Sequence, residues 1–260
     1  RARGACAVHE AGRRRAGYSH RMANEAKRWM TVLSMVVITA VVGLVFASTP
    51  AFAWANGTGG CNSYGTHDWI LNKAMKAVGD DASWVRVRVA LRATDDPDCK
   101  DGIDHASGTW WHVYDRWGSE YGGADEATAV WFRRIEKRLE AGKDKAASRA
   151  LGIMSHFVGD VAQPMHTDSS DKEDGVHSSY ESAVDSRSER GDGVYGFSYD
   201  GKDLAKPATT IRRLARQAHK AYKELVRVYD RHGYNDRVHS ITKRQLKRAA
   251  NALTGLISSF

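Results

Sequence analysis

Histidine and carboxylate residues lie close together in the middle of the sequence, at spacings that suit metal binding. His156 and Asp160 are four residues apart, and His177 and Glu181 repeat this spacing, with His166 between the two pairs. Residues four apart in a helix lie on one face, a single turn from each other. Imidazole nitrogens and carboxylate oxygens are donors that suit zinc. The pattern therefore predicts a metal site.

Other catalytic patterns give weaker predictions. The sequence contains no GxSxG elbow and no Walker A loop, which disfavours a serine hydrolase of that type and a P-loop enzyme. A single histidine on a helix is more often a structural residue than a ligand. Three histidine-containing elements within 26 residues are harder to explain in that way, so we favour the metal site.

Residues 1–53 are interpreted as an upstream segment followed by a secretory signal peptide. Within residues 22–53, a basic start precedes an apolar run, and Ala51-Phe52-Ala53 fits the A-x-A cleavage rule. Cleavage there would leave Trp54 as the first residue of a secreted protein. The alternative is a membrane anchor, because about 17 apolar residues approach the roughly 20 needed to span a bilayer. Pro50 and its small neighbours favour cleavage, and we assign residues 1–21 no function.

Charge and composition narrow the classes of protein. Residues 1–53 hold eight Lys/Arg and two Asp/Glu, and so carry most of the net charge of +8. Residues 54–260 are nearly neutral, with 31 basic and 29 acidic side chains, which disfavours nucleic acid as a partner. A hydrophobic content of 42% and a mean hydropathy of −0.52 indicate a globular domain. No protein partner is evident.

Two cysteines remain after the signal peptide, Cys61 and Cys99. An even pair in an exported chain can form a disulfide, and two unpaired thiols are the alternative. The pair lacks CxxC spacing, so it does not indicate a zinc-thiolate or thioredoxin-like site.

Helical periodicity dominates residues 54–260, and no series of strand hairpins appears. The predicted helices begin at Thr66 and span residues 126–142, 145 to about 161, 207 to about 229, and 240–257, the last capped by Ser240. We therefore expect a single, mostly helical, all-α domain at residues 54–260.

Three segments are less regular. Residues 85–89 alternate as a strand would, but an isolated strand has no partner, so we assign them to a helix. Residues 101–123 and 167–202 are rich in Gly, Ser and Asp and are predicted to be long loops. Loops of this length in a compact domain are often functional.

The segment from Leu151 to His166, LGIMSHFVGDVAQPMH, closely resembles the signature of the zinc-dependent bacterial phospholipase C family. That family shares its fold with the single-strand-specific zinc nucleases of fungi and plants. The segments 175–181 and 65–70 resemble two further motifs of the family. The similarity extends from Trp54 to about Asp185, and it implies a mostly helical domain around a trinuclear zinc cluster.

The resemblance also implies which residues bind the three zinc ions. One ion would be held by Asp95, His112, His156 and Asp160. The second would be held by the α-amino nitrogen and carbonyl oxygen of Trp54, with His67 and Asp160. The third would be held by His166, His177 and Glu181. Asp95 would in addition orient or deprotonate the attacking water.

Two of these assignments have close alternatives. Asp95 is preferred to Asp96 and Asp98 because the preceding Leu-Arg-Ala-Thr matches the family's run into its ligand aspartate. The acidic residues around it could instead form a solvated loop. His112 is preferred to His105 because the sequence around it resembles the family's His-aromatic-Tyr-Asp segment.

The activity that the resemblance implies is phospholipase C. A hydroxide bridging two zinc ions would attack a phospholipid at the membrane surface, releasing diacylglycerol and a phosphorylated headgroup. The sequence His177-Ser-Ser-Tyr-Glu181 resembles the lipase form more than the nuclease form. A single-strand-specific zinc nuclease and a non-catalytic, zinc-stabilised binding protein are the alternatives. Choline-preferring relatives place an aromatic residue after the ligand aspartate, where this chain has Asp96, so we do not expect choline recognition through a cation–π face.

Overall fold

The computed structural model describes residues 54, 61–117, 120–168, 175–188, 195–199 and 206–260. All regular secondary structure in these residues is helical, which confirms the expected all-α fold. The α-helices are α2 (Thr66–Val78), α3 (Val87–Ala93), α4 (Asp96–Cys99), α5 (Ala124–Glu140), α6 (Asp144–Ala162), α7 (His177–Ser188), α8 (Pro207–His232) and α9 (Asp236–Ile257). Three short 3-10 helices are η1 (Gly79–Ala82), η2 (Thr109–His112) and η3 (Pro164–Thr167).

The predicted signal peptide falls outside this part of the chain, because residues 1–53 are not among those described. Residues 51–260 form one compact unit. Within its described part, no helix is both long enough and apolar enough to cross a membrane.

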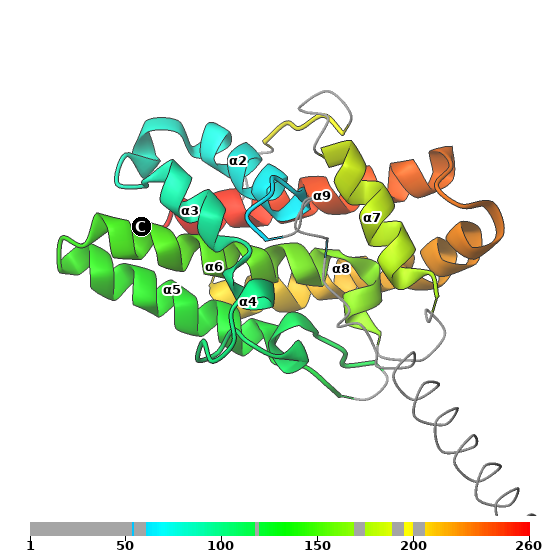
Figure 1. The fold of residues 1–260 in the computed structure, drawn as a ribbon, viewed down its shortest axis with the longest axis horizontal. Coiled ribbons are helices and arrows are strands. Elements are labelled where there is room, and N and C mark those ends of the chain that lie inside the picture. Colours follow the sequence, from blue (N-terminus) through cyan, green and yellow to red (C-terminus); the bar gives the residue numbers. More distant parts are fainter. Residues whose placement is uncertain (1–53, 55–60, 118–119, 169–174, 189–194, 200–205) are drawn as a thin grey trace, which may run out of the picture. The chain divides into compact units, whose positions relative to one another are not determined.

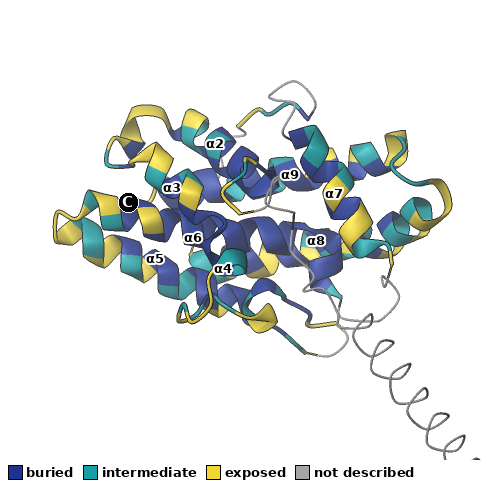
Figure 2. Ribbon diagram, in the orientation of Figure 1, coloured by how far each residue is buried: buried dark blue, intermediate teal, exposed yellow. Residues whose placement is uncertain are grey.

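Helix α6 is the centre of the fold, and it contacts α2, α3, α5, α8 and α9 (Figure 1). Every residue of α6 from Ala150 to Ala162 is buried, as the continuous dark blue of this helix shows (Figure 2). A helix that is surrounded by others must be apolar or small on all sides. The polar residues His156 and Asp160 in this stretch are therefore exceptions that need buried partners.

Two glycines let neighbouring helices approach α6 closely. A Cβ atom on Gly152 would lie 2.1 Å from the carbonyl oxygen of Ala90 in α3. A Cβ atom on Gly159 would lie 2.6 Å from Nδ1 of His67 in α2. Both distances are far below van der Waals contact, so a larger residue would push α3 or α2 away from α6.

Helix α7 is a correction to the sequence analysis, which predicted a loop over residues 167–202. The helix has no clear apolar stripe in sequence, and its position is fixed by tertiary contacts. Asp185 accepts a hydrogen bond from the backbone N–H of Thr66 at 2.8 Å, and the hydroxyls of Tyr180 and Thr242 are 3.0 Å apart. Tyr180, Glu181 and Asp185 are buried. Local composition could not reveal these long-range partners.

The other predictions of local structure are mostly confirmed. Residues 101–123 hold only η2 among their described part, as expected for a long loop. Helix α3 begins at Val87, inside the alternating segment that was assigned to a helix. The predicted cap of the last helix is wrong, because α9 begins earlier. Asn235 caps it by accepting the N–H of Val238, and Ser240 lies inside the helix.

The structure joins Cys61 and Cys99 in a disulfide, which confirms the predicted pair. The bond ties the segment before α2 to the end of α4. Beside it, the backbone N–H of Asn62 donates to Asp95 Oδ2 at 2.5 Å. The two segments are thus held together by a covalent bond and a hydrogen bond.

We predict that Gly159→Ala moves α2 away from α6. Overpacking of this kind costs about 1–3 kcal/mol of stability, against a gain in helix propensity of about 1 kcal/mol. The variant should unfold at a lower temperature and bind zinc more weakly, since His67 is displaced. Gly152→Ala is the matched control, because its clash is with α3 and leaves His67 in place. Equal zinc affinity in the two variants would contradict this role of Gly159.

Candidate metal centre

Buried side chains meet in three groups whose donor atoms lie within 4.8 Å of one another. The groups are His67, His156 and Asp160; Asp98, His112 and His156; and His166, His177 and Glu181. They come from five helical elements and share His156. Seven of the nine residues predicted as ligands are in these groups. The exceptions are Trp54, whose predicted donors are backbone atoms, and Asp95.

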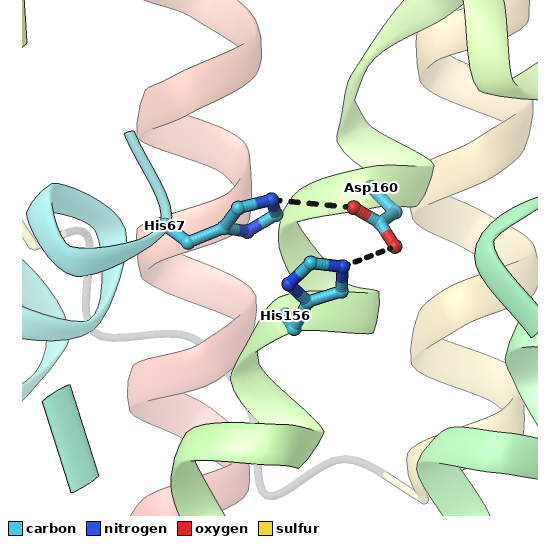
Figure 3. Close-up of side chains that lie close together, drawn as sticks. All are labelled: His67, His156 and Asp160. Atoms are coloured by element: carbon cyan, nitrogen blue, oxygen red, sulfur yellow. Dashed lines mark ion pairs between the residues drawn. The ribbon is translucent and has the colours of Figure 1, made fainter. Parts of the chain in front are cut away.

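Asp160 is the hub of the first two groups (Figure 3). Its side chain has no exposed surface, and its Oδ1 is 3.4 Å from His67 Nε2. Its Oδ2 is 3.3 Å from His156 Nε2 and 3.0 Å from His112 Nδ1. The rings of His67 and His156 stack at 4.0 Å. One carboxylate therefore faces three imidazole rings from three different elements.

Backbone carbonyls fix which nitrogen each histidine presents to the centre. His156 Nδ1 is 2.7 Å from the carbonyl oxygen of Thr94, and His166 Nδ1 is 2.9 Å from that of His112. His112 Nε2 is 3.2 Å from the carbonyl oxygen of Ala106. A carbonyl only accepts, so each of these nitrogens carries the proton. The opposite nitrogen keeps its lone pair toward the centre, as in most metal-ligating histidines.

The third group lies at the end of α6 and the start of α7. His177 Nε2 is 2.8 Å from Glu181 Oε1, and His166 Nε2 is 3.5 Å from the same oxygen. The amide Nε2 of Gln163 donates to Glu181 Oε1 at 2.9 Å and is 2.9 Å from His177 Nε2. The sequence analysis did not identify Gln163. Only its place directly before Pro164, at the end of α6, hinted at such a position.

Asp98, and not Asp95, stands in the group with His112 and His156. Its Oδ1 is 3.6 Å from His112 Nδ1 and 3.5 Å from His156 Nε2. The carboxylate of Asp95 instead accepts hydrogen bonds from the backbone of Asn62 and from Thr94 Oγ1 at 3.2 Å. The ligand position that the resemblance assigned to Asp95 is thus filled here by Asp98, next to the disulfide cysteine.

The remaining alternatives are also resolved in space. Asp96 is buried and pairs with Arg149 at 2.6 Å and with Lys100. His105 contacts Asp104 at 2.7 Å and belongs to none of the three groups, whereas His112 belongs to one. The preference for His112 over His105 therefore agrees with the geometry.

Trp54 is buried beside the centre. Its indole Nε1 donates to the carbonyl oxygen of Gly159 at 2.7 Å, and its ring packs against Tyr180 at 5.8 Å. This bond satisfies a carbonyl of the last turn of α6, where no later N–H of the helix is available. Trp54 is thus anchored one residue from Asp160, and its role as a backbone ligand stays a prediction.

Four buried carboxylates give the region a strong negative potential. Burial raises the pKa of Asp68 to about 7 and that of Asp95 to about 6. Burial alone would lower the pKa of His156, but Asp160 and Asp98 raise it to about 9. Asp98 shows the reverse, because its neighbours His156 and His112 outweigh burial and lower its pKa. Protonated histidines therefore balance the carboxylates when no metal is bound.

The donor set fits zinc. In the described part of the chain, Asp160 Oδ1 and His166 Nε2 are buried and have no hydrogen-bond partner. Such atoms are costly unless a cation or another donor meets them. Neutral imidazole and carboxylate groups that converge in this way match zinc ligands. Each group has three side-chain donors, which leaves a position for water or substrate.

We predict that the metal-free protein loses stability as the pH rises from about 5 to about 9. The pKa values of Asp95, Asp68 and His156 are all raised, so the folded chain binds more protons than the unfolded chain in this range. The free energy of unfolding then falls with pH. The melting temperature of chelator-treated protein should decrease across the range, and zinc should remove most of the decrease. A melting temperature that rises with pH in the absence of metal would contradict the prediction.

Comparisons with known proteins place this centre in a known fold. No protein-family model matches the sequence, and no curated protein matches it. Two solved structures match with high probability. An alpha-toxin of Clostridium perfringens, from the avian strain SWCP, has 15% identity and a TM-score of 0.58. An alpha toxin from Clostridium absonum has 15% identity and a TM-score of 0.60.

Each match covers 75% of this chain and 62% of the clostridial chain, so the similarity spans about three-fifths of the length of those proteins. An identity of 15% shows the fold and does not transfer an activity. The three groups of donor residues, described above from this chain alone, thus lie in an all-α domain with the fold of the clostridial alpha-toxins.

Proposed function

We propose that this chain is a secreted, zinc-dependent phosphodiester hydrolase, and specifically a phospholipase C. The observation that carries the proposal is the set of three donor groups around the buried Asp160, in a domain with the alpha-toxin fold. The sequence resemblance to zinc-dependent phospholipases C supports the choice of activity. The predicted signal peptide supports secretion.

Zinc, when bound, would lower the pKa of a coordinated water and neutralise charge on the phosphate oxygens. The residues of the three groups would hold three ions. Trp54 would complete the site of His67 and Asp160 through its amino and carbonyl groups, which requires cleavage after Ala53. A free amine has the lone pair that a peptide nitrogen lacks.

Asp98 is the residue that we assign to the water, in place of Asp95. Its carboxylate faces His112 and His156, and its lowered pKa keeps it ionised at neutral pH. An ionised carboxylate at this position would orient the water and accept its proton. The backbone bonds of His112 and His156 hold both rings in place while this happens.

The test of the activity compares two substrates. The protein beginning at Trp54 should release phosphorylated headgroup from phosphatidylcholine and phosphatidylethanolamine vesicles, and chelation should stop this release while zinc restores it. Single-stranded DNA should be hydrolysed far more slowly. The reverse preference would identify a nuclease, and no turnover of either substrate by the zinc-loaded protein would favour a zinc-stabilised binding protein.

A matched pair of variants tests the assignment of Asp98. Asp98→Asn removes a carboxylate of the second group and should lower kcat by about 100-fold or more, a magnitude typical of a general base. Asp95→Asn changes a neighbour that only accepts hydrogen bonds, so zinc content should be retained and kcat should fall less. If Asp95→Asn is the more damaging to zinc content and kcat, the original choice of Asp95 as ligand is correct.

A further inference from the structure

The charge of residues 54–260 is unevenly distributed, although it nearly cancels in total. Residues 54–205 contain 18 basic and 26 acidic side chains, a net charge of −8. Residues 206–260, which form α8 and α9, contain 13 basic and three acidic side chains, a net charge of +10. The metal ligands all lie in the acidic part. The positive charge is thus concentrated on one pair of helices.

The basic residues of α8 lie in one exposed row. They occur at intervals of three or four residues, which keeps them on one face of the helix. All six are exposed: Arg213, Arg216, Lys220, Lys223, Arg227 and Arg231. Helix α8 has 26 residues and is about 39 Å long, so the row extends across much of the domain. The opposite face of α8 is apolar and packs on the core.

Helix α9 lies beside α8 and widens this row (Figure 1). Arg248 donates to the carbonyl oxygen of Gln217 in α8 at 3.4 Å, and Arg244 is one turn before it. Burial and the neighbouring Arg244 lower the pKa of Arg248. We call the row on α8, together with Arg244 and Arg248, the cationic face.

Few acidic side chains balance the cationic face. Glu224 pairs with Arg237 at 2.6 Å, and Arg212 pairs with Asp125 at 2.9 Å, both beside the row. In the described part of the chain, Arg216, Lys220, Lys223 and Arg227 form no salt bridge. Their charges therefore add to a positive potential that an anionic partner would neutralise.

An exposed tryptophan lies at the margin of the cationic face. Trp117 is 43% exposed, and its ring stacks on His219 of α8 at 4.3 Å. Arg216 and Lys223 are three and four residues from His219, so they are its neighbours on the helix surface. Trp117 is in the same loop as the predicted ligand His112. The margin of the cationic face thus adjoins the loop that carries a metal ligand.

We propose that the cationic face, with Trp117 at its margin, is a docking surface for an anionic lipid bilayer. Lys and Arg side chains near a bilayer are attracted to anionic headgroups, and tryptophan prefers the interface between water and lipid. Contact would be through the exposed charged side of α8, since its apolar side is buried in the domain. The choice of a lipid partner rests in part on the proposed function.

Nucleic acid fits this surface less well. Proteins that bind single strands stack bases on exposed aromatic rings. The exposed large hydrophobic residues of the described chain are Tyr64, Val87, Trp110, Trp117 and Tyr199, and none of them is on α8 or α9. A duplex is read by a helix that enters the major groove. Helix α8 is flanked by α5 and α9 and does not project in that way.

The test uses vesicles without phosphodiesters, so binding cannot depend on turnover. The full mature chain is sedimented with digalactosyldiacylglycerol vesicles, alone or with about a third of the anionic sulfoquinovosyldiacylglycerol. We expect binding to the anionic vesicles only, weakening as salt is raised. Replacing Arg216, Lys220, Lys223 and Arg227 with glutamine should weaken binding about a hundredfold or more.

The matched control removes four exposed charges from other parts of the domain, by replacing Arg88, Lys137, Lys143 and Lys145 with glutamine. It should bind the anionic vesicles nearly as well as the original chain. The inference is overturned if the two variants bind equally, if the chain ignores anionic vesicles, or if it binds DNA but not vesicles. A chain that docks but hydrolyses no phospholipid would contradict the proposed function and leave the docking surface intact.

Discussion

The carboxylate of Asp160 is fully buried at the centre of a helical domain, and the rest of the site depends on how its charge is balanced. An isolated buried carboxylate is strongly unfavourable, and it becomes acceptable only with close cations and hydrogen bonds. Asp98 adds a second, nearly buried negative charge within reach of the same histidines. Three imidazole rings around Asp160 are enough to balance these charges only when protons or metal ions are bound.

The surrounding fold serves to hold those rings at short distances. Gly159 lets α2 bring His67 against α6, and the disulfide of Cys99 holds the segment that carries Asp98. Backbone carbonyls then orient individual rings, so the site is rigid before any ligand arrives. The same rigidity separates the acidic, metal-binding part of the domain from the basic pair α8 and α9.

Much of this could be predicted from the sequence, because it depends on local spacing. The His156 and Asp160 pair, four residues apart on a buried helix, indicated both the helix and its ligating face. Helix α7 could not be predicted in the same way, since its stability comes from partners such as Thr66 that lie far away in sequence. Asp98 was missed for a similar reason. Neighbouring acidic residues look alike in sequence, and only the turn into α4 and the disulfide decide which carboxylate faces the histidines.

The most direct test of the account is a measurement of anomalous X-ray scattering at the zinc edge, on crystals of the protein beginning at Trp54 grown with zinc. The account predicts three strong peaks. Two would lie on either side of Asp160, one beside His67 and one beside Asp98, and the third would lie beside Glu181. Peaks confined to surface histidines, or no peak near Asp160, would show that the buried carboxylate is balanced by protons alone and that the centre is not a metal site.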